Sequence, residues 1–268
     1  MFAAYLFSIR DALNRRMALV LIGLSIVLAV VFNWIIQVKL LPGPVIFLGP
    51  RMFWAADLGV PSVLSAGLEF TGGVFWLLLA ILAAAPILSS SLDKGWVELT
   101  LSKGTARWQI LLGGYLAGVT VYFTAVVLAL APIALRLWWQ TKISSWPLAV
   151  SILLQTFSFA ALLALASLAS LPRIGAAPPV LLAMAVSIVS AVLAQRERGL
   201  YQVLTSRWSH WIFDWLYRIL PKTSELSGMA SSYIHGEKFT TWWPFWSTGV
   251  FIVATLGLTA WLLHRKSL

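Results

Sequence analysis

Six long apolar runs, none with a charged residue at its centre, constrain this chain more than any other feature. The hydrocarbon layer of a bilayer is about 30 Å thick and an α-helix rises about 1.5 Å per residue, so a span needs roughly 20 apolar residues. The runs are apolar on all sides rather than alternating, which favours helices over transmembrane strands. We predict six transmembrane helices, at 17–36, 73–92, 108–135, 147–171, 176–195 and 244–263.

The composition supports the same class of protein. Hydrophobic residues make up 60% of the chain and charged residues only 10%, which a soluble domain does not tolerate on its surface. Residues 1–268 are therefore predicted to form a single all-α, polytopic membrane domain. Arg10, Arg15 and Arg16 precede the first run as in a signal peptide, but the run is long and lacks a small-residue cleavage pattern, so we expect a retained span.

Lys and Arg in short loops indicate the orientation, because they are retained on the cytoplasmic side. With the N-terminus inside, the inner segments hold nine of these residues, and the outer segments hold four in short loops and six in the long loop 196–243. This count favours a multi-pass protein of the cell (inner, cytoplasmic) membrane with both termini in the cytoplasm. The net charge of +10 is scattered along helix ends, which indicates contact with membrane lipids and not with nucleic acid.

The N-terminal segment has apolar residues at helical spacing, with Arg10, Asp11, Asn14 and Arg15 on the opposite side. This pattern predicts an amphipathic helix lying along the inner membrane surface, and the alternative is a simple extension of the first span.

The outer loop holds a second amphipathic pattern. Trp208, Trp211 and Trp215 share one face with three aliphatic residues, while polar and charged residues occupy the other face, and Pro221 ends the run. Tryptophan is enriched in the headgroup layer, so we predict an interfacial helix, with a substrate-recognition surface as the alternative. His210 and His235 lack neighbouring ligands, so no metal site is predicted.

A charged segment separates the second and third predicted spans. Gly95 and Gly104 interrupt helical structure, and about eight residues between them are able to form a short helix. So short a helix is not stable alone in water, so it must be docked against something, and the charge count places it in the cytoplasm.

This segment resembles the permease subunits of ABC-2 type exporters, in particular the subgroup associated with multicopper-enzyme maturation. The family pattern is an acidic residue, three residues of any kind, then Gly-Thr-Leu-Glu-x-Leu-Leu, then x-x-Pro-x-Ser-Arg. Trp96, Gly104 and Ala106 depart from the usual Thr, Pro and Ser. The matching stretch here is Asp93, Lys94, Gly95, Trp96, Val97, Glu98, Leu99, Thr100 and Leu101, followed by Gly104, Thr105, Ala106 and Arg107.

The resemblance implies that segment 93–107 is the coupling loop that docks on a separate ATPase subunit. It assigns ATPase coupling to Asp93, Gly95, Glu98, Leu99, Leu101, Gly104 and Arg107. In that arrangement Glu98 meets a polar or basic edge of a groove that the leucines fill, and the N-terminal helix is an elbow that braces the coupling region. The expected partners are two ABC ATPase subunits and a second permease chain, identical or paralogous.

The chain itself is not expected to be an enzyme, because no Gly-Lys dipeptide is present from which a phosphate-binding loop could be built. ATP and Mg²⁺ would then be bound by the partner subunit, and this chain would hold no cofactor. Gly114 and Gly118 predict a close helix contact, either within the chain or between two copies. A secondary transporter or an intramembrane enzyme remains the alternative, disfavoured because no span has an ionisable residue at its centre.

Overall fold

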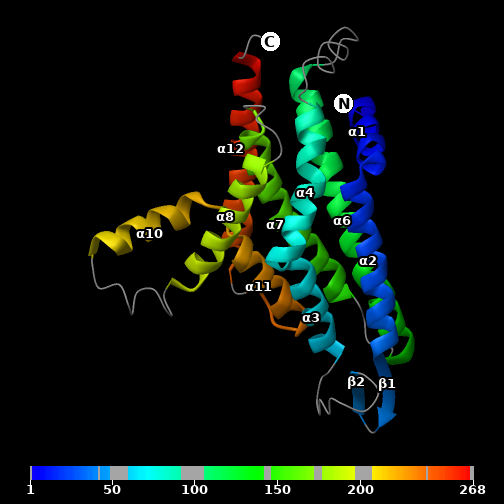
Figure 1. The fold of residues 1–268 in the computed structure, drawn as a ribbon. Coiled ribbons are helices and arrows are strands. Elements are labelled where there is room, and N and C mark those ends of the chain that lie inside the picture. Colours follow the sequence, from blue (N-terminus) through cyan, green and yellow to red (C-terminus); the bar gives the residue numbers. More distant parts are fainter. Residues whose placement is uncertain are drawn as a thin grey trace.

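The structure is a computed structural model that describes residues 2–41, 43–48, 60–91, 106–141, 146–171, 177–196, 207–239 and 241–265. These residues form a helical bundle with one short β-hairpin (Figure 1). In chain order the elements are α1 (Phe2–Asn14), α2 (Arg16–Ile35), β1 (Ile36–Leu41), β2 (Gly43–Leu48), α3 (Val60–Gly72), α4 (Val74–Ser91), α6 (Arg107–Thr141), α7 (Trp146–Ala169), α8 (Ala177–Ala194), α10 (Arg207–Ile219), α11 (Thr223–Ile234) and α12 (Trp243–Arg265).

Five helices of the described part are long and apolar enough to cross a membrane, by length and composition. The prediction of a helical chain with several helices able to cross a membrane is therefore confirmed, by the length and composition of these helices. The predicted bounds of these five helices agree with the observed ones to within a few residues, except that α6 continues to Thr141. The five segments are Arg16–Asn33, Arg107–Trp139, Trp146–Ala169, Ala177–Ala194 and Trp243–Arg265.

The predicted second span, 73–92, agrees with α4, which runs from Val74 to Ser91, but a further helix that was not predicted, α3, begins before it at Val60. The two helices meet at a break at Gly73 and are bent by 49°. If this bent pair counts as one span, the chain has up to six. The carbonyl oxygens of Glu69 and Phe70 would each lie 3.2 Å from a Cβ at position 73, so glycine suits the tight turn.

Helix α7 lies at the centre of the bundle, between α4, α6, α8, α11 and α12. Phe159 at its middle is fully buried and stacks on Tyr122 of α6, with 4.1 Å between the ring centroids. A Cβ on Gly118 would come within 2.7 Å of Leu163 on α7 and 3.2 Å of Ala84 on α4. Gly118 therefore lies at a close contact within the chain, where three helices meet.

The N-terminal helix α1 packs against α6 and α4. Ala12 is fully buried, and the Tyr5 hydroxyl lies 3.1 Å from Thr120 Oγ1 on α6. Figure 1 shows α1 and α2 following one another along the same side of α6. The predicted amphipathic helix is therefore present as α1, separate from α2. Its place along the inner membrane surface and its role as an elbow stay predictions.

The hairpin of β1 and β2 was not predicted. The two strands are antiparallel and pair Ile36 with Leu48 and Leu41 with Gly43. The hairpin follows α2 without a gap, because the apolar sequence continues past Ile35 with alternating residues that suit a strand.

Candidate functional site

The first candidate region is the end of the bundle at which the chain begins. The N-terminal end of α1, the start of α6 and the C-terminal end of α12 all lie at this end (Figure 1). The predicted coupling residues Asp93, Gly95, Glu98, Leu99, Leu101 and Gly104 lie outside the described residues, which resume at Ala106. In the chain they stand between α4 and α6.

Arg107 is the one predicted coupling residue that the structure describes. Its Nη1 atom donates a hydrogen bond of 3.2 Å to the carbonyl oxygen of Leu263, near the end of α12. The last carbonyl groups of a helix lack partners within the helix, and a cation there also complements the helix dipole. Arg107 therefore fastens the start of α6 to the end of α12.

The second candidate region begins with the Trp-rich helix α10, whose predicted existence is confirmed. Its apolar side is open: Trp208 is 75% exposed, Trp211 57% and Trp215 52%. The rings of Trp208 and Trp211 contact edge to face, with 6.4 Å between centroids. Figure 1 shows α10 projecting sideways from the bundle, so this apolar face is not covered by the rest of the described chain.

Helix α11, which follows α10, is inserted among the long helices and was missed by the sequence analysis. The Ser151 hydroxyl donates to the Ala230 carbonyl at 2.7 Å, and the Ser158 hydroxyl donates to the Thr223 carbonyl at 3.3 Å. The order of these pairs makes α11 antiparallel to α7. Ser158 lies 12 residues beyond Trp146, which corresponds to about 18 Å along α7. The start of α11 therefore lies well inside the bundle.

Lys222 lies in the turn between α10 and α11, directly before the first residue of α11. It is only 3% exposed, and its Nζ atom donates to Ser247 Oγ at 2.9 Å. Its backbone N–H donates to Thr248 Oγ1 at 3.2 Å. The Nζ atom also lies 4.4 Å from the centroid of the Tyr217 ring and 5.4 Å from that of Trp243. Burial lowers the pKa of Lys222, against the attraction of Glu225, which raises it.

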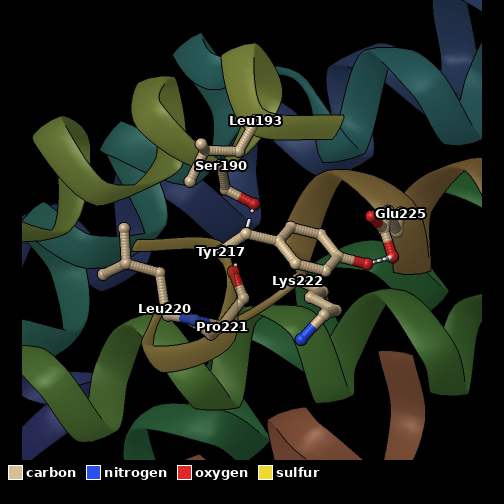
Figure 2. Close-up of a pocket in the computed structure, with 7 residues that line it drawn as sticks. All are labelled: Ser190, Leu193, Tyr217, Leu220, Pro221, Lys222 and Glu225. Carbon is tan, nitrogen blue, oxygen red and sulfur yellow. Dashed lines mark hydrogen bonds between the residues drawn. The ribbon is translucent and has the colours of Figure 1, made fainter. Parts of the chain in front are cut away.

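Tyr217 links α10 to α11 through Glu225 (Figure 2) and also contacts Arg196, which follows α8. Its hydroxyl donates to Glu225 Oε2 at 3.0 Å, and the Arg196 guanidinium lies 3.3 Å from its ring centroid. Arg196 also lies 3.8 Å from Asp214 on α10. Burial, followed by the hydrogen bond to Glu225, raises the pKa of Tyr217 to about 12. The phenol is therefore neutral at physiological pH and is held as a donor.

A small cavity adjoins this cluster. It has a volume of about 10 Å³, near the minimum for one water molecule, and is too small for an organic substrate. The Ser190 hydroxyl donates to the Pro221 carbonyl at 3.1 Å and accepts from the Ser224 N–H at 3.3 Å, so α8 holds the start of α11. The lining residues are Ser190, Leu193, Tyr217, Leu220, Pro221, Lys222 and Glu225 (Figure 2).

The residues Arg196, Asp214, Tyr217, Lys222 and Glu225 form a cluster around the turn between α10 and α11. It is able to hold α10 and α11 in a fixed relation to α8 and α12, and it places a buried cation among the helices. Within the described ranges no group of three His, Asp or Glu residues could hold a metal ion. Sequence reasoning missed this cluster because its residues lie in a loop, and only Pro221-Lys222 following an amphipathic run indicated a turn there.

Comparison of the chain with protein-family models, with curated proteins and with solved structures finds no match.

Proposed function

We propose that this chain is the membrane permease subunit of an ABC-2 type exporter, driven by a separate ATPase subunit. The observation that carries the proposal is the segment Asp93–Arg107, with its acidic residues, glycine breaks and closing arginine, between two long apolar helices. The order of long helices, with a Trp-rich helix before the last of them, is in accord with it.

The geometry of the bundle supports this use of the segment. The two helix ends that flank the segment, the end of α4 and the start of α6, lie at the same end of the bundle as the start of α1 and the end of α12 (Figure 1). The distribution of Lys and Arg favours this end as cytoplasmic. A soluble ATPase would meet the chain at that end. Arg107 ties the segment's exit to α12, so a force on the segment would reach both α6 and α12.

In this proposal the chain resides in the cell membrane with both termini in the cytoplasm and pairs with a second permease chain. Two ATPase subunits bind ATP and Mg²⁺, and alternating access between the two permease chains moves cargo outward. The exposed apolar side of α2, which includes Val27 and Val30, is available to lipid or to the second chain.

Charge reversal of the coupling segment tests the proposal. Glu98→Arg is expected to leave the permease in the membrane at normal abundance, since surface changes away from cores are usually tolerated. It should release the ATPase, because a like-charge contact or broken pair at an interface costs about 2–5 kcal/mol. Leu99→Asp and Leu101→Asp should do the same.

The matched control is Glu237→Arg, the same chemical change at an exposed residue of the loop between α11 and α12. Glu237→Arg should retain the ATPase and full export. Full ATPase binding and export by Glu98→Arg would refute the coupling role.

A second candidate function is favoured by one observation. Lys222 is buried where the start of α11 meets the first turns of α12, so a buried ionisable residue is present in the assembled bundle although the span centres hold none. An ion-coupled secondary transporter would use such a group. It would transport cargo in vesicles with an ion gradient and without ATP, whereas the ABC-type exporter requires ATP and its partner.

A further inference from the structure

An open groove runs along the surface of the bundle between α6 and α7. Its volume is about 540 Å³, within the range of roughly 300–1,000 Å³ in which proteins hold small organic ligands. On α6 its lining extends from Phe123 to Trp138, and on α7 from Leu148 to Leu153, and every lining residue is apolar. Apolar cavities stay dry, so water is not the occupant that this groove suits.

The groove is hollow because small residues stand beside large ones. Ala131 of α6 and Ala149 of α7 both line the groove and are exposed, and Ala134 beside them is buried. Leu135 is 62% exposed and Leu153 is 59% exposed, one from each helix. These leucine side chains extend beyond the alanines, so the alanines form the floor of the groove and the leucines its rim.

The position of the groove along α6 matches one leaflet of a bilayer. Both α6 and α7 are long and apolar enough to cross a membrane. Phe123 and Trp138 are separated by about 22 Å along the helix, which is half of a bilayer of about 40–45 Å with its headgroups. Trp138, Trp139 and Trp146 are all exposed at one end of the groove, and tryptophan is enriched at the headgroup level. With both chain termini in the cytoplasm, this is the outer leaflet.

A transmembrane helix of a second chain fits this groove poorly. A helix with its side chains is about 10–12 Å wide, and helices associate in lipid through close packing, which needs small residues along the contact. Leu135, Leu153 and Trp138 would keep such a helix away from the alanine floor. An acyl chain is thin and flexible enough to lie on the floor, where it restores the dispersion contacts that an empty groove lacks.

We propose that the groove between α6 and α7 binds one acyl chain of a membrane phospholipid. The headgroup of this lipid lies at the level of Trp138. Its acyl chain runs over Ala134 and Ala131 towards Phe123, with α6 on one side and α7 on the other. Contact on two sides distinguishes this chain from lipids that merely cover the exposed faces of the bundle. The inference rests on the insertion of α6 and α7 into a membrane and does not depend on the ATPase partner.

Photochemical labelling tests the proposal. The chain is reconstituted in phosphatidylcholine nanodiscs that contain a small fraction of phosphatidylcholine with a diazirine on its acyl chain, and the labelled peptides are identified by mass spectrometry. Labelling should be concentrated on the groove and be weaker on the exposed side of α12 around Val253. Ala131→Phe fills the groove from an exposed position and should lower the labelling there by about fivefold or more, which corresponds to about 1 kcal/mol.

Ala254→Phe is the matched control, the same change at an exposed alanine of α12, and it should leave the labelling of the groove unchanged. Ala149→Phe, on the other side of the groove, should act like Ala131→Phe. Uniform labelling of all exposed faces, or groove labelling that neither variant lowers, overturns the proposal. Cross-links between two copies of the chain through Ala131→Cys, in place of lipid adducts, would assign the groove to a second copy and also refute it. If the filled variants do not assemble, the labelling pattern of the wild type decides by itself, because the proposal requires enrichment at the groove.

Discussion

Individual polar side chains join α8, α10 and α11, and Tyr217 takes part in several of these contacts. It binds Glu225 through its hydroxyl and receives Arg196 and Lys222 on its ring. These contacts join the end of α8, the helix α10 and the start of α11. The neutral phenol is what the site requires, because a phenolate would repel Glu225.

The pH dependence of stability tests this role of Tyr217. Its pKa is raised from 10.0 to about 12 in the folded chain, so the unfolded chain loses the phenol proton first. The contribution of Tyr217 is therefore complete below pH 10 and is lost as the pH rises towards 12. We expect the stability difference between the wild type and Tyr217→Phe, measured by unfolding in micelles, to shrink over this interval. A difference that stays constant would show that the hydroxyl is not held by Glu225.

Substitution of glycine tests the close contact at the helix break. Gly72→Ala places a Cβ in the position of the Gln155 amide, in a packed core, and should cost at least about 1–3 kcal/mol. Gly257→Ala is the matched control on α12, where no atom lies within 4 Å of the new Cβ, and it should be neutral or slightly stabilising. Equal thermal stability of the two variants in micelles would contradict the packing described at Gly72.

At the scale of elements, the two helices of the outer loop differ in what covers them. Helix α11 is held by hydroxyl groups of α7 and α8, whereas the apolar side of α10 is open. An exposed apolar face of this size normally meets a partner or a membrane, and three tryptophans on it favour the headgroup layer. The polar links at Tyr217 and Arg196 would connect that layer to α11.

Probe accessibility tests the environment of α10. Single cysteines at Trp211 and Trp215, labelled with spin probes, should be accessible to oxygen dissolved in lipid. Probes at His210 and Asp214 should instead be accessible to a water-soluble nickel reagent, because they lie on the opposite side of the helix. Equal aqueous exposure of all four positions would mean that α10 lies away from the bilayer.

The long helices could be predicted from the sequence because their signal is local. A run such as 108–135 is apolar over a full bilayer thickness, whatever its neighbours are. Helix α11 could not be predicted in this way. Its sequence, TSELSGMASSYI, is short and rich in small and polar residues, and its burial depends on serines of α7 and α8. The burial of Lys222 depends on the position of α11, so it could not be predicted either.

The helix break at Gly72-Gly73 and the packing of α1 could be predicted only in part. The pair Gly72-Gly73 is visible in the sequence, but a bend there depends on Tyr122 and Gln155, which are distant along the chain. The amphipathic pattern of α1 is equally compatible with a helix on a membrane surface and with a helix packed against α6. In the structure α1 packs against α6. The coupling residues before Arg107 stay a prediction.

In a permease with six spans and both termini in the cytoplasm, the two ends of the bundle face opposite sides of the membrane. Single cysteines at Lys103 and Glu237 should therefore react with impermeant reagents from opposite sides, Lys103 only from the cytoplasm and Glu237 only from outside. Labelling of both from the same side of sealed vesicles would overturn the six-span arrangement and, with it, the cytoplasmic position of the coupling segment.

The composition of the native complex tests the proposed dependence on ATP. The chain, purified with a C-terminal tag from its own membranes in mild detergent, would be weighed by native mass spectrometry and assayed for ATP hydrolysis. We expect an assembly of two permease chains with two ATPase subunits, which hydrolyses ATP and which dissociates in Glu98→Arg but not in Glu237→Arg. A folded chain that purifies without any nucleotide-binding subunit, and that transports its cargo in ATP-free vesicles, would contradict it.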